Sequence, residues 1–503
     1  MTLRRWKLWL CGLEGWAAGL LVLSLPFTSF PLVARLTGSS MVAPLALLPL
    51  ALLIVVWFVP YLLRSGRLPP QSLPLLGFCG AALLASLLAY FISIPSYQSV
   101  SLFNSEIEAL VTLAIGVIFY LVIAAWAGSH QRLAFLLRWV NWSGLLIVVW
   151  SLVQAGVWYR LQVYPEWMVT LQSLITTNGT LYQQRAAGFA YEPSWLAHQL
   201  NMLYLPYWLA AAVSDYSAHR WRLGRLHFEH LLLVGGVGAL LLSVSRVGLL
   251  AFLLMVAYLL LWANIRLVHW LQGRLFRRFP PGERRTRVLR FWFGLASLLV
   301  LVMVYGSMLI GAGIGLSRYD QRMQKLFDIT ALREQSFLHY ANQLVFAERI
   351  VFWQAGWEVF NDHPLLGVGL GNAGFYFPEK LSAFSWALTE VRMLMYHWTT
   401  LPNIKSLWVR MLAETGVVGF AFFVSWCYVL WMSARFLTHQ PDRLMRALGL
   451  AGCFVLVGLI IEGFSVDTFA LPYYWVTLGL VTAACESARC LPVRGTTPIG
   501  EEA

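Results

Sequence analysis

The second apolar stretch of the chain reads MVAPLALLPLALLIVVWFVPYLL from Met41 to Leu63 and contains no charged residue. The motif Arg64-Ser-Gly-Arg67 follows it directly. A helix of about 20 apolar residues crosses the hydrocarbon core of a bilayer, so this stretch predicts a transmembrane helix. Short Lys/Arg clusters next to such helices favour the cytoplasmic side of a membrane.

The composition of the whole chain agrees with this stretch. The 503 residues are 59% hydrophobic and 12% charged, they include 24 tryptophans, and the mean hydropathy is +0.67. Such a chain cannot cover itself with a water-soluble surface, which excludes soluble enzymes and binding modules. The net charge of +13 is therefore a signal of membrane topology and not of nucleic-acid binding.

Apolar windows of transmembrane length recur along the chain and predict an all-α polytopic integral membrane protein with about twelve helices. The windows are approximately Gly12–Leu32, Met41–Leu63, Ser72–Ile94, Ile107–Trp126, Leu133–Trp158, Trp195–Val213, two short spans joined at Ser243–Gly248, Phe291–Leu316, Leu407–Leu437, Leu448–Phe464 and Phe469–Ala484.

The basic residues set the expected orientation of these helices. The chain starts with Arg4, Arg5 and Lys7, and the first apolar run is too long for a cleaved signal peptide and lacks a small-residue cleavage site. Eight arginines lie between Ile265 and Arg290, the densest basic run in the chain. With every such cluster on the cytoplasmic side, both termini are expected to be cytoplasmic.

The predicted organisation has four parts. Residues 1–194 hold N-terminal transmembrane helices and an outer loop, 159–194; residues 195–316 hold core helices with a Ser-Arg-x-Gly turn. Residues 317–406 are expected to form a large outer loop with short amphipathic helices, and residues 407–503 the C-terminal transmembrane helices and a cytoplasmic tail. Loops of this length often carry function, so the two outer loops are the expected location of the chemistry.

The first outer loop ends in Arg185 and in Tyr191-Glu192-Pro193, immediately before a predicted span. Glu192 and Pro193 are typical of a helix start, which is one interpretation of the segment. The other is a guanidinium and a carboxylate held at the membrane surface for the headgroup of an amphiphilic substrate, with Tyr191 in support.

Two more arginines are expected on the same side of the membrane. Arg246 stands between two apolar halves, where an arginine is costly unless it binds an anion or anchors at the interface. Arg349 lies on a predicted amphipathic helix, Asn342–Phe360, whose aromatic side could lie on the bilayer; the alternative is a solvated helix face. Guanidinium groups suit phosphate because their planar donors bind two oxygens at once.

The start of the tenth predicted span adds further polar residues. Arg410 and Glu414 are four residues apart, which predicts a pair on one helix face with a structural role or a part in a buried relay. Lys405 and Asn403 lie at the outer mouth of this helix, where they could contact a headgroup.

Two familiar sites are not expected. The run Gly367-Val-Gly369-Leu-Gly371 lacks the strand and helix of a dinucleotide-binding loop, and a tight turn is the better interpretation. His363 and His397 have no close metal-ligand spacing around them, so we expect no metal and no other cofactor.

A family resemblance rests on a set of motifs. The chain resembles the bacterial O-antigen polymerase and ligase superfamily, the Wzy and WaaL type, over roughly Trp195–Leu437. The motifs that carry the resemblance are Ser245-Arg246-x-Gly248, Arg349-x-x-x-Trp353, Asp362-His363-Pro364-Leu-Leu-Gly-Val-Gly-Leu-Gly371-Asn372 and Lys405-Ser406-Leu-Trp-Val-Arg-Met-Leu-Ala-Glu414-Thr-Gly416-Val-Val-Gly419.

The resemblance implies a metal-independent glycosyltransferase at the outer face of the bacterial inner membrane. Its donor is an oligosaccharide on undecaprenyl diphosphate; an acceptor hydroxyl attacks the anomeric carbon, and the lipid diphosphate leaves. The predicted diphosphate-binding residues are Arg185, Arg246, Arg349 and Lys405. A chain-length regulator and export proteins are the partners that the family implies.

One departure from the family concerns the base. Many relatives have a His-Asn type pair at the start of the Glu-Thr-Gly helix, and the histidine is thought to act on the acceptor hydroxyl. This chain has Lys405-Ser406 there. The predicted base is therefore Glu192, with His397 second, because an ammonium must lose its proton before it can act as a base.

The departure also bears on the reaction. Pro402-Asn-x-Lys405-Ser and Ala190-Tyr-Glu-Pro-Ser194 look more like polymerases of exopolysaccharide or capsule than like ligases of lipid A-core. The sequence thus predicts a polymerase, with the ligase as the alternative within the same chemistry. A flippase for lipid-linked oligosaccharides is the alternative of another class, but it should place its charges along a central path.

Overall fold

The structure, a computed structural model of the chain, describes residues 3–38, 41–224, 226–275, 284–317, 346–397 and 400–490. Within them the one two-stranded sheet is the antiparallel pair β1 (Arg222–Leu223) and β2 (Leu226–His227). Everything else of regular structure is helical, so the all-α prediction is confirmed.

The helices follow one another with short connections in the N-terminal half. Their bounds are α1 Leu3–Leu23, α2 Pro31–Thr37, α3 Leu47–Leu53, η1 Ile54–Phe58, α4 Val59–Leu63, η2 Pro70–Ser72, α5 Leu73–Ala89, α6 Leu102–Trp126, α7 His130–Leu161, α8 Glu166–Ile175, α9 Pro193–Gln199, η3 Leu200–Tyr204, α10 Leu205–Ser214 and α11 Phe228–Ser243.

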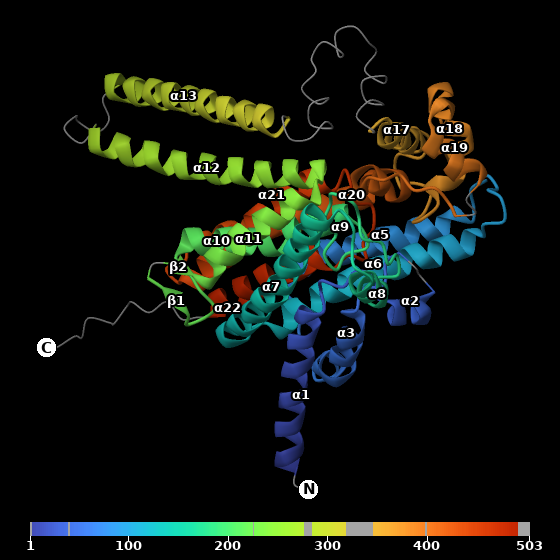
Figure 1. Cartoon of the computed structure of the whole chain (residues 1–503), viewed down its shortest axis with the longest axis horizontal. Coiled ribbons are helices and arrows are strands. Elements are labelled where there is room, and N and C mark those ends of the chain that lie inside the picture. Colours follow the sequence, from blue (N-terminus) through green and yellow to red (C-terminus); the bar gives the residue numbers. More distant parts are fainter. Residues whose placement is uncertain are drawn as a thin grey trace, which may run out of the picture.

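The C-terminal half begins with two long helices that lie side by side in Figure 1. Its helices are α12 Arg246–Leu275, α13 Arg284–Ser317, α17 Ala347–Asp362, η5 Ala373–Tyr376, α18 Phe377–Lys380, η6 Ala383–Ala387, α19 Thr389–Tyr396, α20 Leu407–Thr438, α21 Arg443–Glu462 and α22 Tyr473–Cys490.

Seven of the described helices are long and apolar enough to cross a membrane, and further apolar helices are shorter. Each of the twelve windows expected from the sequence contains a helix. The seven long segments are Pro70–Ala89, Leu102–Trp126, His130–Leu161, Arg246–Leu275, Val288–Ser307, Leu407–Thr438 and Arg443–Glu462. The prediction of a polytopic membrane protein is confirmed.

Aromatic side chains fill the centre of the bundle, where α20, α21 and α22 pack against α5, α6 and α10. The rings of Trp426 and Trp475 are 5.2 Å apart, and Tyr120 meets Trp426 edge-on at 5.1 Å. All three side chains are buried, and the Tyr120 hydroxyl bonds Thr482 Oγ1 at 3.0 Å. These aromatic side chains therefore fill the bundle interior where the six helices meet.

A proline explains the π-helical turn η3 inside the sixth expected span. Pro206 has no N–H, so the carbonyl of Met202, four residues earlier, loses its helical donor. The hydroxyl of Thr477, on α22, donates to that carbonyl at 2.7 Å. A partner from a neighbouring helix is how a broken helix satisfies its backbone where water is absent.

The helices α17, α18 and α19 form a second layer with an apolar core of its own. Phe352 is fully buried and stacks on Phe377 at 5.6 Å, and Tyr97, from the loop between α5 and α6, donates to Leu394 O at 3.4 Å. The expectation that the aromatic side of the Arg349 helix lies on the bilayer is wrong for Phe352. The first four residues of the helix predicted over 342–360 lie outside the described residues.

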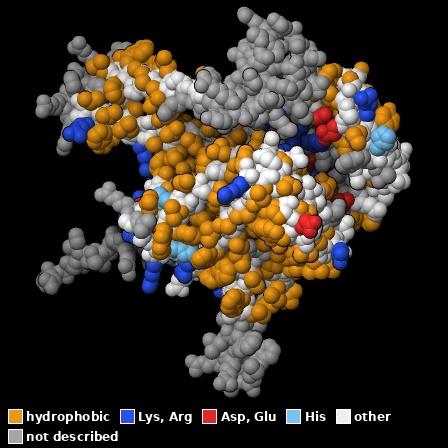
Figure 2. All heavy atoms as spheres, in the orientation of Figure 1, with side chains coloured by type: hydrophobic (Ala, Val, Ile, Leu, Met, Phe, Trp, Pro, Cys, Tyr) orange, Lys and Arg blue, Asp and Glu red, His pale blue; other side chains and the backbone are white. Residues whose placement is uncertain are grey.

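The arrangement of the layers separates two ends of the molecule. Figure 1 shows α17, α18 and α19 at one end and β1 and β2 at the other. Hydrophobic side chains cover most of the described atoms on the face in Figure 2, whereas basic and acidic side chains meet beside α17. The charged residues of the second layer thus gather at one end of an apolar bundle.

Candidate active site

The candidate site is built around a break in α20. Gly416 has φ 62° and ψ −170°, so two helical segments meet at this residue. In an unbroken helix the N–H groups of Val417 and Val418 would bond the carbonyls of Ala413 and Glu414. Here they bond Pro364 O at 2.8 Å and Leu365 O at 3.2 Å instead.

The loop that follows α17 enters this break. The carbonyls that α20 leaves free accept hydrogen bonds from the loop, Ala413 O from Val368 N and Glu414 O from Gly369 N, each at 3.0 Å. Gly367 has φ +69°, and a Cβ there would lie 2.4 Å from the carbonyl carbon of Glu414. The glycine-rich motif is a turn, as predicted, and it also docks the second layer on the bundle.

The predicted pair on α20 is present. Arg410 Nε lies 2.9 Å from Glu414 Oε2, and both side chains are largely buried. Arg410 Nη1 also donates to Asp467 O at 2.5 Å, in the loop between α21 and α22. The i,i+4 pair therefore stabilises the first turns of α20 and fastens them to that loop, which favours the structural interpretation.

Lys405 lies just before α20 and is held at three points. Its N–H donates to Asp467 Oδ2 at 3.2 Å, its carbonyl accepts a hydrogen bond from Trp353 Nε1 at 3.2 Å, and its ammonium forms an ion pair with Glu390, on α19. The ammonium also lies 5.1 Å from the centroid of the Phe352 ring. Lys405 thus joins α17, α19 and α20.

Arg349 and Glu348, in the first turn of α17, complete a group of four that we call the Lys405 cluster: Glu348, Arg349, Glu390 and Lys405. Arg349 Nη1 donates to Ser465 O at 3.0 Å. Burial and the neighbouring Glu390 carboxylate raise the pKa of Glu348 to about 7, although Lys405 and Arg349 act in the other direction. The cluster therefore holds two cations and two carboxyl groups of unequal acidity.

The acidity of Glu390 changes in the opposite direction. Burial raises the pKa of Glu390, but its ion pair with Lys405 and its hydrogen bond with Glu348 outweigh burial, so the net pKa is lowered. Two carboxyl groups that share a site commonly divide in this way, one staying ionised while the other keeps its proton to higher pH.

No sequence pattern predicts that the carboxylates of Glu348 and Glu390 belong to this cluster. Glu348 is adjacent to Arg349, but no motif marks it, and Glu390 lies in a segment without a recognisable pattern. Only the packing of α19 against α17 and the 92–102 loop brings Glu390 to Lys405.

Arg185 and Arg246 belong to a second group, at the turn between α11 and α12. Arg185 Nε donates to Ser243 O at 3.1 Å, and the N–H of Ala186 bonds Leu242 O at 2.9 Å. Arg246 is the first residue of α12, just after Val244, which has φ 50°. The predicted turn between two helices is confirmed, and the structure brings Arg185 to it.

Glu192 lies close to this group as the residue that precedes α9. The helix starts at Pro193, as the sequence predicts, and the hydroxyl of Ser194 donates to the Glu192 carboxylate. Tyr191 contacts the Trp195 ring at 5.5 Å, and its carbonyl accepts a hydrogen bond from Asn178 at 3.0 Å. The role of Glu192 as a base stays a prediction.

A buried polar node connects the two groups. Asn201 Nδ2 donates to Gly248 O, in the first turn of α12, at 2.8 Å and to Glu462 Oε1 at 2.7 Å. His198 Nδ1 lies 3.2 Å from Glu462 Oε2. Glu462 ends α21, and the N–H of Ser465, whose carbonyl holds Arg349, bonds Glu462 O at 2.8 Å. Short hydrogen bonds thus join the Arg246 turn to the Arg349 end.

We expect Asn201→Ala to destabilise the protein and to weaken activity. The substitution removes the donor of two buried acceptors, and an unsatisfied buried acceptor costs about 1–3 kcal/mol. The measurement is the melting temperature in detergent together with turnover. Thr112→Ala is the control, because the Thr112 hydroxyl bonds only Ala109 O in its own helix among the contacts described. Equal melting temperatures for both variants would contradict the role of the node.

The remaining predicted residues lie at the edge of the second layer. His397 follows the last residue of α19 and is exposed, and Asn403 is exposed in the segment before α20. Neither side chain has a described hydrogen bond into the Lys405 cluster. The structure therefore brings Lys405, Arg349 and Arg410 together and leaves His397 and Asn403 outside the group.

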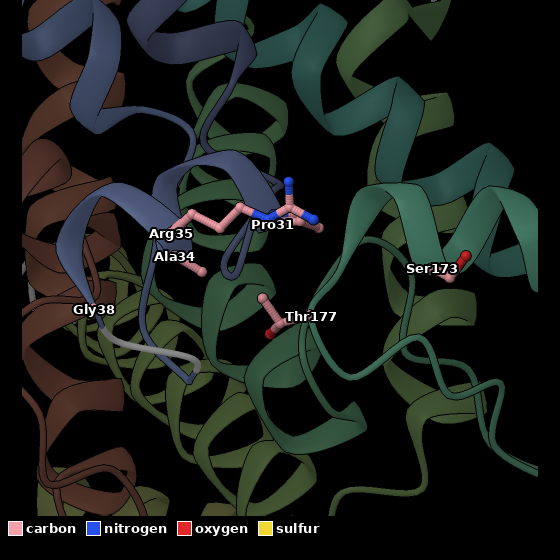
Figure 3. A pocket seen from close by; sticks show the side chains of 6 residues that line it. All are labelled: Pro31, Ala34, Arg35, Gly38, Ser173 and Thr177. Atoms are coloured by element: carbon pink, nitrogen blue, oxygen red, sulfur yellow. The ribbon is translucent and has the colours of Figure 1, made fainter.

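Two hollows open on the described surface. One of about 270 Å³ lies against the docked loop and is mostly apolar, between Leu88, Ile92 and residues 363–367. The other, of about 370 Å³, lies between α2 and the end of α8, with Arg35 across it and Thr177 on the far wall (Figure 3). Figure 1 shows α2 well apart from α17, so the second hollow is separate from the Lys405 cluster.

The motifs of this site lie in a part of the chain that resembles a known protein family. Residues 231–424 match the model of the O-antigen ligase family. This match supports the resemblance of the chain to the O-antigen polymerase and ligase superfamily. The match covers Arg246, the whole Lys405 cluster and the broken part of α20, and it lies within the range of the resemblance found in the sequence. No curated protein matches the chain.

Members of the O-antigen polymerase and ligase superfamily are glycosyltransferase-like enzymes that take a lipid-linked saccharide in a membrane. The fold suits such a substrate, because acidic and basic side chains meet beside α17 on an otherwise largely hydrophobic face. Among the described residues, no group of three or more His, Cys, Asp or Glu side chains is placed to hold a metal ion.

Proposed function

We propose that this protein is a polysaccharide polymerase of the bacterial inner membrane. It transfers a glycan from undecaprenyl diphosphate to another lipid-linked repeat unit at the periplasmic face, and both of its termini are cytoplasmic. Arg246 and Arg349 bind the diphosphate of the donor, with Arg185 next to the first and Lys405 next to the second. A chain-length regulator and export proteins act with it.

One observation carries this proposal. The two arginine groups come from segments about a hundred residues apart, yet both are tied to the node of Asn201 and Glu462 by short hydrogen bonds. Cations that are fixed in place stabilise charge that develops on a leaving group, and a diphosphate leaves with its charge concentrated on oxygen. The node gives the two arginines a common support.

The packing of the bundle interior weighs against a flippase. A transporter needs polar groups along a path between the two faces, whereas Tyr120, Trp426 and Trp475 fill the described centre of this bundle. The ligase alternative shares the site and differs in its acceptor. A polymerase is favoured because Lys405, paired with Glu390, stands where many ligases have a histidine.

A reconstitution assay tests the proposal. The purified protein in liposomes receives undecaprenyl-diphosphate-linked repeat units from its own bacterium, in buffer with EDTA and without any other acceptor. We expect a ladder of products on a gel, because one lipid-linked molecule serves as donor and another as acceptor. A single transfer that appears only when lipid A-core is added would favour a ligase, and transbilayer movement of the lipid without new glycosidic bonds would favour a flippase.

A further inference from the structure

We propose that Glu348 is the base that takes the proton from the acceptor sugar hydroxyl, and that Glu390, held by Lys405, is the residue that positions it and sets its charge. This inference rests on the proposed glycosyl transfer. It assigns the base to neither Glu192 nor His397, the two candidates from the sequence.

The geometry of the Lys405 cluster is the first argument. Glu348 and Arg349 are consecutive residues in the first turn of α17, and the positive charge of Arg349, which we assign to the donor diphosphate, acts on the Glu348 carboxyl group. Glu348 is only partly buried, and the Glu390 side chain is 44% exposed. A substrate can therefore reach both carboxyl groups, as a base in proton transfer requires.

The fixed position of Lys405 is the second argument. Its backbone is held by Asp467 and Trp353, and its ammonium by Glu390 above the Phe352 ring. A lysine held in this way can orient Glu390 and keep it ionised. It therefore has a function in the cluster even though it cannot replace the histidine that many relatives have at the start of this helix.

The charge balance is the third argument. Arg349 and Lys405 contribute two positive charges, and Glu390 one negative charge. Because the pKa of Glu348 is raised to about 7, by burial first and by Glu390 second, its carboxyl group exchanges a proton near neutral pH. A base with a pKa near the working pH is efficient, since it is available and still basic enough to accept a proton.

The proposed transfer forms one glycosidic bond and breaks one. The acceptor hydroxyl loses its proton to the Glu348 carboxylate while its oxygen forms the new bond to the anomeric carbon of the donor. The bond between that carbon and the diphosphate oxygen breaks, and its electron pair leaves with undecaprenyl diphosphate next to Arg349. Glu348 then releases the proton to water and is ready for the next cycle.

Other carboxylates of the region have structural partners. Glu414 pairs with Arg410, Asp467 accepts the Lys405 N–H, and Glu462 accepts Asn201 in the bundle interior. Glu192 accepts the hydroxyl of Ser194 at the start of α9. Of these described groups, Glu348 alone combines partial exposure, a neighbouring carboxyl group and direct contiguity with Arg349.

The test compares variants in the liposome assay. Glu348→Gln is expected to lower kcat about 100-fold or more, the usual contribution of general-base catalysis, with little change in the KM of the lipid-linked donor. The control is Glu358→Gln, on the same helix and without a described ion pair, which should keep full activity. Binding of undecaprenyl diphosphate, measured by thermal stabilisation, should persist in both variants.

A pH profile separates the tuning role of Glu390 from a structural one. In the wild type, kcat/KM should rise with pH and level off above about pH 7, as Glu348 loses its proton. Glu390→Gln removes the neighbouring negative charge, so the pKa of Glu348 should fall and the rise should move to lower pH. A variant that is only partly folded would show a lower kcat/KM at every pH, but the midpoint of its pH profile would not move.

Three results would overturn the inference: full activity of Glu348→Gln, an unmoved profile in Glu390→Gln, or a 100-fold loss in Glu192→Gln with none in Glu348→Gln. If Glu348→Gln does not fold, Glu348→Asp decides, because a base should keep part of its rate with a shifted profile. If the proposed function itself is wrong, the wild-type protein will form no ladder, and this result distinguishes that failure from a failure of the inference about Glu348.

Discussion

Arg349→Ala is expected to abolish ladder formation, with a loss of rate of about 100–1,000-fold. Arg349 is partly buried, its guanidinium is fixed by Ser465 O at 3.0 Å, and it is assigned to the leaving diphosphate. Removing one fixed donor that stabilises developing charge typically costs that much. The measurement is turnover of lipid-linked repeat units in liposomes.

A further variant separates the charge of Arg349 from the planar donors of its guanidinium. Arg349→Lys keeps the charge and loses the planar pair of donors, so an intermediate loss of about tenfold is expected. Arg392→Ala is the matched control, because Arg392 is an exposed arginine of the same layer, on α19. Wild-type turnover in Arg349→Ala would remove this arginine from the site and weaken the proposed function.

Gly416→Val is expected to prevent correct folding of the second layer. Gly416 has a positive φ, and a Cβ there would lie 2.2 Å from Leu365 O, one of the carbonyls that bond to α20. The backbone penalty of about 1–3 kcal/mol adds to the cost of displacing the docked loop. The measurements are the yield of monodisperse protein in detergent and its melting temperature.

Gly80→Ala is the control for this prediction. Gly80 lies in α5, and a Cβ built on it meets no atom within 4 Å outside the backbone of its own helix, so the melting temperature should not fall. A Gly416→Val protein with the melting temperature of the wild type would show that the loop does not depend on the break in α20.

The break in α20 also explains what the glycine-rich motif does in this protein. Glycines near positions 367–371 and at 416 could suggest a nucleotide-binding loop or simple helix flexibility. The N–H groups of Val368 and Gly369 in the loop, and of Val417 and Val418 in the helix, instead donate hydrogen bonds between the loop and the broken helix. Gly367, Gly371 and Gly416 are required where a second backbone approaches too closely for a side chain.

Several properties of this protein follow from local sequence. Apolar windows predict membrane helices because a bilayer sets one length for all of them, and Pro193 predicts the start of α9 because its ring fits the first turn. The Arg410–Glu414 pair could be predicted from spacing alone, since residues four apart share a helix face. In each case the cause lies within one turn or one helix.

The candidate site depends on contacts that no spacing encodes. Glu390 meets Lys405 and Glu348 only because α17, α19 and the start of α20 pack into one layer, and Asn201 meets Glu462 across 261 positions of the chain. Composition and periodicity determined that this chain is a polytopic membrane protein with arginines in its loops. Tertiary packing decided which carboxyl groups stand beside those arginines, because burial and neighbouring charge, and not residue type, set the acidity of a carboxyl group.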